Sequence, residues 1–290
     1  MQGHEEIRVK QSEVKGYADV IAALRALPDG EFIIKDNFLY EDANFALEQF
    51  CKSQEWHDTV VALKPRPGVR VLDYGAGRCI ASIAFACLGC NVVAMDINAS
   101  PEVGLGILQR GQIFNQYAVN VQSVVGDGEH IPFEPDAFDI VYCPEALHHA
   151  FNLKKLASNL VRVLKPGGRF FAYGDHCRPW WSSDEQFRRI HPAVKFGVNE
   201  HSYLKSEHRR ALSRAGLQNV RIVPILSRPS QRWHHWGMLQ VAKLPFLGKA
   251  LYHFYDRLRH YRAIGSQIII LGEKKACGYF LSHLISPIHL

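Results

Sequence analysis

The segment from Val69 to Leu88 constrains the fold of this 290-residue chain more than any other. An apolar run, Val69 to Tyr74, leads directly into Gly75-Ala76-Gly77 and then into a helix-like stretch that begins at Arg78. Glycines two residues apart allow the tight turn that joins a buried strand to the helix after it. The segment therefore predicts one strand and one helix of a parallel sheet covered on both faces.

The same alternation continues along the chain. Further strands are predicted at 91–96, 121–126, 137–143, 169–173, 220–225 and 267–271, and helices at 103–117, 153–164 and 206–215. Short apolar strands that alternate with helices are typical of right-handed strand–helix–strand units. We therefore predict the α/β class, with a doubly wound, mostly parallel, Rossmann-like sheet of about seven strands.

The sheet defines the predicted domain boundaries. Residues 66–275 form the main domain, with insertions at 177–203 and 227–264, and residues 276–290 form a C-terminal tail. Residues 1–65 form a helical cap, with helices at 16–27 and from Asp42 or Asn44 to about Leu63. The chain is 47% hydrophobic and 21% charged, as expected for a soluble protein with a sizeable core.

Several classes of protein fit the sequence poorly. The first residues lack the basic and apolar regions of a secretory signal, and no apolar run approaches the roughly 18–20 residues that span a bilayer. The seven cysteines are scattered, and Cys87 and Cys90, the pair with CxxC spacing, have no second pair to complete a zinc site. We predict both to be small buried residues at a helix end, and the protein to be cytoplasmic.

An acid lies at or just after each of the first three predicted strands: Asp73, Asp96 and Asp127. The carboxyl ends of parallel strands meet at one edge of the sheet, where ligands bind in this class. Asp96 is placed to accept hydrogen bonds from ribose hydroxyls, and Asp127 from an adenine amino group. A helix cap at Asp96 and an Asp-Gly turn at Asp127 are the structural alternatives.

The glycine turn separates two classes of nucleotide ligand. A dinucleotide fingerprint continues to a third glycine or alanine, where this chain has Ile80. The negative charge of an acid such as Asp73 repels a pyrophosphate and attracts the ammonium group of an amino acid. The pattern therefore favours S-adenosyl-L-methionine over NAD as the cofactor.

Five motifs resemble, in order, those of class I S-adenosylmethionine-dependent methyltransferases, in particular the type 11 and ubiquinone-biosynthesis group: VLDYGAGRC, AMDI, GDGEHIPF, AFDIVYCPEALHHA and VLKPGGRFF. The resemblance is close over 66–172 and loose over 200–223. It implies that the last of seven strands, 267–271, is reversed. It also implies a cofactor site in which Asp73, Gly75 and Gly77 hold the methionine part, Asp96 the ribose, and Asp127 with Gly128 the adenine. Ala76, Ile97 and Glu129 are further candidates for contact with the cofactor. The helix after Asp96 departs from the pattern at Pro101 and Gly104.

Candidate catalytic residues follow the fourth and fifth strands. A proton acceptor is needed if the methyl acceptor is a hydroxyl, and histidine with a carboxylate neighbour suits that role. We favour His149 and His176 as bases, with His148 and Asp175 as further candidates; contact without proton transfer is the alternative. His148, His149, Asp175, His176 and Cys177 could also meet around a metal ion, but their spacing carries no ligand signature, so no metal site is predicted.

The two insertions bear on the acceptor. In 177–203, Trp180 and Trp181 either stack on a sugar or aromatic ring or form the core of a lid, and Glu145, His201 and Tyr203 are further substrate candidates. The stretch Asn199-Glu200-His201 is similar to one in methyltransferases encoded among glycan-assembly enzymes.

The insertion 227–264 is basic. It holds seven Lys and Arg residues against one acid, Asp256, and this difference equals the net charge of +6 of the whole chain. Such a local charge argues against a broad nucleic-acid surface. It fits either a helix on an anionic membrane or a helix packed on the domain or in a homodimer contact.

We therefore expect a methyltransferase that acts at oxygen on a small-molecule or glycan-type acceptor. A C- or N-methyltransferase for a quinone-like, natural-product or peptide acceptor, and a non-catalytic subunit that binds the cofactor, are the alternatives.

Overall fold

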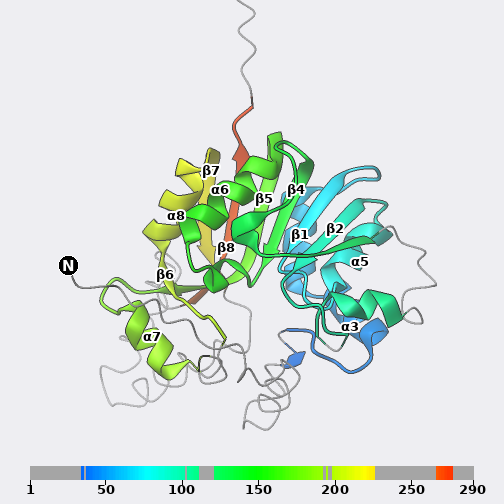
Figure 1. Ribbon diagram of the computed structural model, residues 1–290, viewed down its shortest axis with the longest axis horizontal. Helices are drawn as coiled ribbons and strands as arrows, with labels where there is room; N and C mark the ends of the chain where they lie inside the picture. Colours follow the sequence, from blue (N-terminus) through cyan, green and yellow to red (C-terminus); the bar gives the residue numbers. More distant parts are fainter. Residues whose placement is uncertain are drawn as a thin grey trace, which may run out of the picture.

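An eight-stranded sheet forms the centre of the computed structural model, which describes residues 34–35, 37–101, 103–110, 121–191, 194, 198–225 and 266–276 (Figure 1). Seven strands follow the order β3-β2-β1-β4-β5-β8-β7, and β6 pairs with β5 off this path. Their bounds are β1 Arg70–Tyr74, β2 Asn91–Asp96, β3 Val121–Val125, β4 Phe138–Pro144, β5 Leu164–Arg178, β6 Tyr203–Leu204, β7 Leu217–Pro224 and β8 Ser266–Lys274.

The directions of the strands confirm the predicted fold class. β1 to β6 pair in parallel, whereas β8 lies antiparallel between β5 and β7. The order of the strands reverses between β1 and β4, and in open α/β sheets such a switch point is where ligands bind.

Helices cover both faces of the sheet. α3 (Ala43–Cys51), α4 (Gln54–Leu63) and α5 (Ile80–Cys87) share a core with one face, and α6 (Leu153–Val163) and α8 (Lys205–Arg214) with the other (Figure 1). The side chains of a strand alternate between faces, so Val71 packs toward the first group and Leu72 toward the second. α7 (Asp184–Ile190) follows β5.

Some predicted elements are wrong in their bounds. The helix expected up to Leu63 is two helices, because Asp42 caps α3 and Ser53 caps α4 with its hydroxyl. β5 begins at Leu164, directly after α6, and residues 165–168 lie in a register shift between its pairings with Phe138 and Ile140. The predicted helix 103–117 is a 3₁₀ helix, η2 (Leu105–Arg110), over its described residues. Cys90 is buried as predicted, but Cys87 is exposed.

The sequence did not predict α7 and β6. The helix predicted at 16–27, the whole insertion 227–264 and the tail beyond residue 276 lie outside the described residues, so the domain boundaries stay a prediction. Among the helices described, none is long and apolar enough to cross a membrane.

Candidate active site

The Gly75-Ala76-Gly77 turn leaves β1 and lies against two neighbouring segments. The N–H groups of Gly75 and Ala76 donate to the Met95 carbonyl oxygen at 2.9 and 3.2 Å. Gly75 has φ +77°, and a Cβ atom added there would lie 2.5 Å from the Cβ of Ala146. Both the backbone conformation and this close approach require glycine. The turn is therefore packed directly against the segment that follows β4.

Asp73 lies at the end of β1 beneath this turn. Its side chain is fully buried, and its Oδ2 accepts a hydrogen bond from the Ser82 hydroxyl at 2.5 Å. Within the described part of the chain, Oδ1 has no hydrogen-bond partner. Burial raises the pKa of Asp73 to about 7, with a smaller contribution from the nearby charge of Asp96. A cationic group placed here would stabilise the charged carboxylate.

Asp96, at the end of β2, is hydrogen-bonded to the Gly75-Ala76-Gly77 turn. Its Oδ2 accepts from the Gly77 N–H at 2.8 Å and its Oδ1 from the Asn98 N–H at 2.8 Å. Burial raises the pKa of Asp96, while these two N–H groups act in the opposite direction. Each carboxylate oxygen can accept a second hydrogen bond, so the contacts leave room for a hydroxyl ligand. Ile97, the next residue, is exposed.

Asp127 caps a single turn of 3₁₀ helix, η4 (Gly128–His130), after β3. Its Oδ1 accepts from the Glu129 N–H at 2.9 Å, and its side chain is half exposed. Gly128 fits closely, since an added Cβ would lie 2.2 Å from the Tyr74 hydroxyl oxygen. Glu129 accepts from the Asn152 N–H at 2.7 Å. The Asp-Gly turn, the structural alternative for Asp127, is thus present, and it lies beyond the carboxyl end of β3.

The segments after β4 and β5 meet beside the cofactor turn. Glu145 follows β4 with φ +46°, and its N–H donates to the Tyr173 carbonyl oxygen at 2.7 Å. Gly174 interrupts the register of β5, and a Cβ there would lie 2.5 Å from Cγ of Glu145. Glycine at this position therefore lets the side chain of Glu145 lie against the end of β5.

His148 and Asp175 form a buried pair between these segments. Asp175 Oδ1 accepts from the backbone N–H of His148 at 3.1 Å and contacts its Nδ1 at 2.9 Å. Burial raises the pKa of Asp175 to about 6 and lowers that of His148 well below its ordinary value, which a charge on His149 lowers further. Near neutral pH an ionised Asp175 therefore faces a neutral His148 whose Nδ1 carries the proton.

His149 is partly exposed and fixed by Asn199. Its Nδ1 lies 2.8 Å from the Asn199 carbonyl oxygen, and the Asn199 side-chain amide donates to the His149 carbonyl oxygen at 2.8 Å. A carbonyl oxygen only accepts, so Nδ1 carries a proton and the neutral ring has its lone pair on Nε2. His149 also affects the pKa of Asp96, which it lowers when charged, so it is electrostatically coupled to the cofactor side.

His176 and Glu200 complete the cluster. The ring centroid of His176 lies 4.6 Å from that of His148, and His148 Nε2 lies 3.6 Å from Glu200 Oε2. Glu200 is 5% exposed, and burial, reinforced by Glu145 and Asp175, raises its pKa to about 8. His191, whose ring centroid lies 5.2 Å from that of His176, has a pKa lowered by burial to about 4. The structure thus brings together all four predicted catalytic residues.

The predicted substrate residues are more dispersed. Trp180 and Trp181 are 76% and 61% exposed, so the lid-core interpretation is wrong. Asp184 contacts His201 Nδ1 at 2.7 Å, and the Tyr203 hydroxyl donates to the Ala150 carbonyl oxygen at 2.9 Å. Tyr203 also borders a hollow of about 500 Å³ on the outer side of α6 and α8. His201 and Tyr203 therefore hold the wall of the site in place.

Comparison with known proteins agrees with this geometry. Residues 72–172 match the family model described as a methyltransferase domain, from β1 to the middle of β5. Residues 72–172 therefore correspond to a methyltransferase domain. The match includes the glycine turn, all three acids after β1 to β3, and both His148 and His149.

Two curated relatives align with the methyltransferase domain. The chain is 36% identical over 151 residues to sterol 24-C-methyltransferase of Schizosaccharomyces pombe, an alignment that covers 48% of this chain and 35% of the relative. It is 33% identical over 119 residues to ubiquinone biosynthesis O-methyltransferase of Dechloromonas aromatica, which covers 40% and 47%. The chain therefore spans less than half of the length of either relative.

A solved structure extends the likeness of the fold. Phosphoethanolamine N-methyltransferase 2 of Haemonchus contortus, in complex with S-adenosyl-L-methionine, superposes with a TM-score of 0.56 at 19% identity, over 91% of this chain and 60% of that one. S-adenosyl-L-methionine, which that structure contains, is also the cofactor that the sequence predicts for this chain. The residues fit it, because the unpartnered Oδ1 of Asp73 suits an ammonium group and the glycine turn admits a ligand close to the backbone.

Sequence reasoning missed the partners of the predicted residues in the methyltransferase domain. It did not assign Asn199 to His149, Glu200 to His148, or Ser82 to Asp73. Asn199 and Glu200 come from the loop between α7 and β6, far from β4 in sequence, and no spacing rule links the two segments. Ser82 faces Asp73 from the first turns of α5, and that position after the glycine turn was the available signal.

Proposed function

We propose that the protein transfers the methyl group of S-adenosyl-L-methionine to an oxygen of a small-molecule or glycan-type acceptor. His149, held by Asn199 beside the cofactor turn, is the observation that supports oxygen as the acceptor atom. A hydroxyl acceptor must lose a proton as it is methylated, whereas a neutral tertiary amine has no proton to lose.

Each group of residues has its own role in this reaction. The buried Asp73 and the turn from Gly75 to Gly77 bind the methionine part, Asp96 the ribose, and Asp127 with Gly128 the adenine. When bound, the cofactor supplies an electrophilic methyl group on a sulfonium that becomes neutral as the methyl leaves. His149 accepts the hydroxyl proton at Nε2, while its Nδ1–H stays bonded to the Asn199 carbonyl oxygen. Alignment and exclusion of water supply much of the remaining acceleration.

Two exposed tryptophans in the segment after β5 support the choice of acceptor. The exposed Trp180 and Trp181 have the flat apolar faces on which sugar and aromatic rings stack. The names of the three proteins compared above refer to carbon, oxygen and nitrogen methylation, so they leave the acceptor atom open. The alternatives are therefore C- or N-methylation of a quinone-like, natural-product or peptide acceptor, or a non-catalytic subunit that binds the cofactor.

Isotope transfer tests the acceptor atom. The protein is incubated with S-adenosyl-L-methionine that carries a deuterated methyl group and with fractionated pools of small metabolites and glycosides. We expect a labelled product in which nuclear magnetic resonance places the methyl group on oxygen. Label on carbon or nitrogen contradicts the proposal in favour of the first alternative. Cofactor binding by calorimetry without transfer in any pool supports the second, and preferential binding of NAD contradicts the cofactor itself.

The role of His149 is tested with the acceptor so found. We expect His149→Ala to lower kcat by about 10²- to 10⁴-fold, the usual contribution of a general base, while the affinity for the cofactor stays unchanged. His57→Ala is the matched control, because His57 is a well-exposed histidine on α4, outside the site. An unchanged kcat in His149→Ala shows that His149 is not the base.

A further inference from the structure

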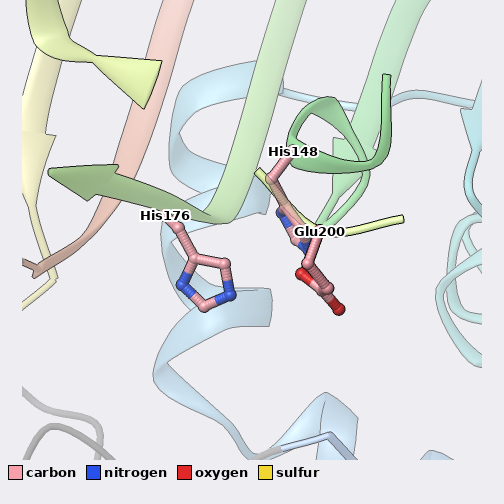
Figure 2. A group of neighbouring side chains, drawn as sticks. All are labelled: His148, His176 and Glu200. Carbon is pink, nitrogen blue, oxygen red and sulfur yellow. The ribbon is translucent and has the colours of Figure 1, made fainter. Parts of the chain in front are cut away.

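Two histidines and a glutamate converge at the ends of three segments that are far apart in sequence. His148 lies on η5 (Leu147–His149), His176 on β5, and Glu200 on the loop before β6. The nearest ligand-type atoms of these three side chains all lie within 4.8 Å of one another. Figure 2 shows the three side chains projecting from their separate backbones into one shared region.

His148 is oriented like a metal ligand. Its Nδ1 is bonded to Asp175 Oδ1 at 2.9 Å, which leaves Nε2 as the nitrogen with the lone pair. Nε2 is the atom that faces Glu200 Oε2, at 3.6 Å. A carboxylate that holds the far nitrogen of a ligating histidine is the recurrent second layer of protein metal sites.

Glu200 supplies the independent observation. Its side chain is about 94% buried, and its Oε2 has no hydrogen-bond partner among the described residues. A buried carboxylate oxygen without a donor is costly. Nε2 of His148 also presents a lone pair toward this oxygen, and at 3.6 Å the two atoms are too far apart to form a hydrogen bond. A cation bound by both would satisfy them.

We propose that His148, His176 and Glu200 bind a divalent transition-metal ion. Two imidazole nitrogens and one carboxylate suit Zn²⁺ or Fe²⁺, and both metals are found in sites with this ligand set and open positions for a further ligand. Mg²⁺ prefers oxygen ligands in a near-ideal octahedron, so a site with two imidazoles disfavours it. The ring centroids of His148 and His149 lie 4.1 Å apart, which puts the ion beside the base proposed above.

The ion extends the proposed function without depending on it. An open position on a metal can bind an oxygen of a substrate and stabilise negative charge on it. In that role the site would select acceptors with an oxygen available to the ion. Metal binding is measurable in the absence of any acceptor or cofactor. An experiment can therefore contradict metal binding and leave methyl transfer supported, or contradict methyl transfer and leave metal binding supported.

Direct metal binding tests the proposal. The full chain, produced without a histidine tag, is stripped with a chelator and dialysed. It is then titrated in a calorimeter with Zn²⁺, with Fe²⁺ under anaerobic conditions, and with Mg²⁺, and the bound metal is counted by elemental analysis. We expect saturable binding of one Zn²⁺ or Fe²⁺ per chain and a higher melting temperature with metal. Absence of saturable Zn²⁺ and Fe²⁺ binding, or preference for Mg²⁺, overturns the proposal.

Variants identify the ligands. We expect Glu200→Gln and His176→Ala to abolish this binding, and Asp175→Asn, which acts through His148, to weaken it about 10- to 100-fold. His57→Ala reports on adventitious binding by surface histidines and should bind as the wild type does. The near-ultraviolet circular dichroism of each metal-free variant shows whether it is folded. Undiminished binding in folded Glu200→Gln and His176→Ala overturns the assignment, whether or not the protein methylates an acceptor.

Discussion

At the scale of single residues, burial destabilises the charged form of the Asp73 side chain in the candidate cofactor site. Its carboxylate is fully buried, with Ser82 as its hydrogen-bond donor and the charge of Asp96 nearby. The pKa of Asp73 is raised to about 7, so the metal-free and cofactor-free protein at neutral pH holds a carboxylate that is only partly ionised. Binding of a cationic amino acid removes this cost.

The raised pKa predicts a specific dependence of stability on pH. An unfolded aspartate titrates near 3.9, so between about pH 4 and 7 the folded state keeps a proton that the unfolded state releases. The contribution of Asp73 to the free energy of unfolding therefore falls as pH rises through this window and is constant above it. Asp73→Asn cannot ionise, and it should lack this fall. Urea denaturation of both proteins from pH 4 to 8 measures the difference.

Asp139 gives a control of opposite sign. Burial acts to raise its pKa, but hydrogen bonds from Lys165 and from the Arg70 N–H outweigh burial and lower it. The stabilisation by Asp139 is present above the unfolded pKa and is lost as pH falls through the lower folded value. Asp139→Asn should thus destabilise at neutral pH only. If Asp73→Asn shows the same pH profile as the wild type, the buried carboxylate is not titrating as described.

At the scale of elements, a contact from α7 holds the loop that carries Glu200. Asp184, in the first turn of α7, accepts from the buried Ser202 N–H at 2.6 Å and contacts His201 at 2.7 Å. We expect Asp184→Ala to leave the Ser202 N–H unsatisfied, at a cost of about 1–3 kcal/mol, which corresponds to roughly 5- to 150-fold faster local hydrogen exchange. Exchange measured by mass spectrometry on peptides over 198–204 checks this.

Glu185→Ala is the matched control for the same helix. It also removes an acid from the first turn of α7, so it changes the helix dipole interaction equally. Glu185 pairs only with the exposed Arg189 among the contacts described for it, and such pairs contribute about 0.3–0.5 kcal/mol. Equal exchange rates over 198–204 in the two variants would show that Asp184 does not hold the loop.

The elements that sequence reasoning found are those with a strong apolar pattern. β1, β2 and β4 are rich in apolar residues, and their bounds were predicted within about a residue. The break between α3 and α4 was missed, because Lys52-Ser53 interrupts the helix through a hydroxyl cap and leaves the apolar periodicity intact. β6 has two residues and exists through its pairing with β5, a tertiary contact that local sequence does not encode.

At the scale of the whole molecule, β8 joins the edge strand β7 to β5 and so to the rest of the sheet. Ile270 is fully buried and pairs with Ala172 of β5 on one side and Ile222 of β7 on the other. We expect Ile270→Ala to lower the free energy of unfolding by about 2–5 kcal/mol, the range for a buried isoleucine. Urea denaturation should still show one transition, since β8 pairs with both β5 and β7 in one continuous sheet.

Val223 on β7 provides the comparison for a similar truncation. Its side chain is 42% exposed, so Val223→Ala should change the free energy of unfolding by no more than about 0.5 kcal/mol. If Ile270→Ala lowers the free energy of unfolding by as little as Val223→Ala does, β8 contributes little to the stability of the core. Two separate transitions would mean that the sheet unfolds in parts.

The residues of the candidate site that come directly after a strand were predicted from the sequence. Asp73, Asp96, Asp127, His148 and His176 lie where the carboxyl ends of the strands placed them. Glu200 was not assigned to the histidine cluster, and Trp180 and Trp181 were left between two interpretations, because all three belong to the segment after β5. The path of such a segment depends on contacts such as Asp184 with Ser202, which no periodicity reveals.

The pairing of β5 with β6 has a consequence for how the protein could be re-engineered. Cys177 pairs with Tyr203 and Arg178 with Leu204, so the stretch between them leaves the sheet and returns to it at one place. A segment whose two ends are already adjacent can be exchanged for one of another length at a small cost in chain entropy. Residues 179–202 are therefore a natural cassette for chimeras that would alter acceptor choice while β1 to β5 keep the cofactor site, provided that each insert retains Asn199 and Glu200.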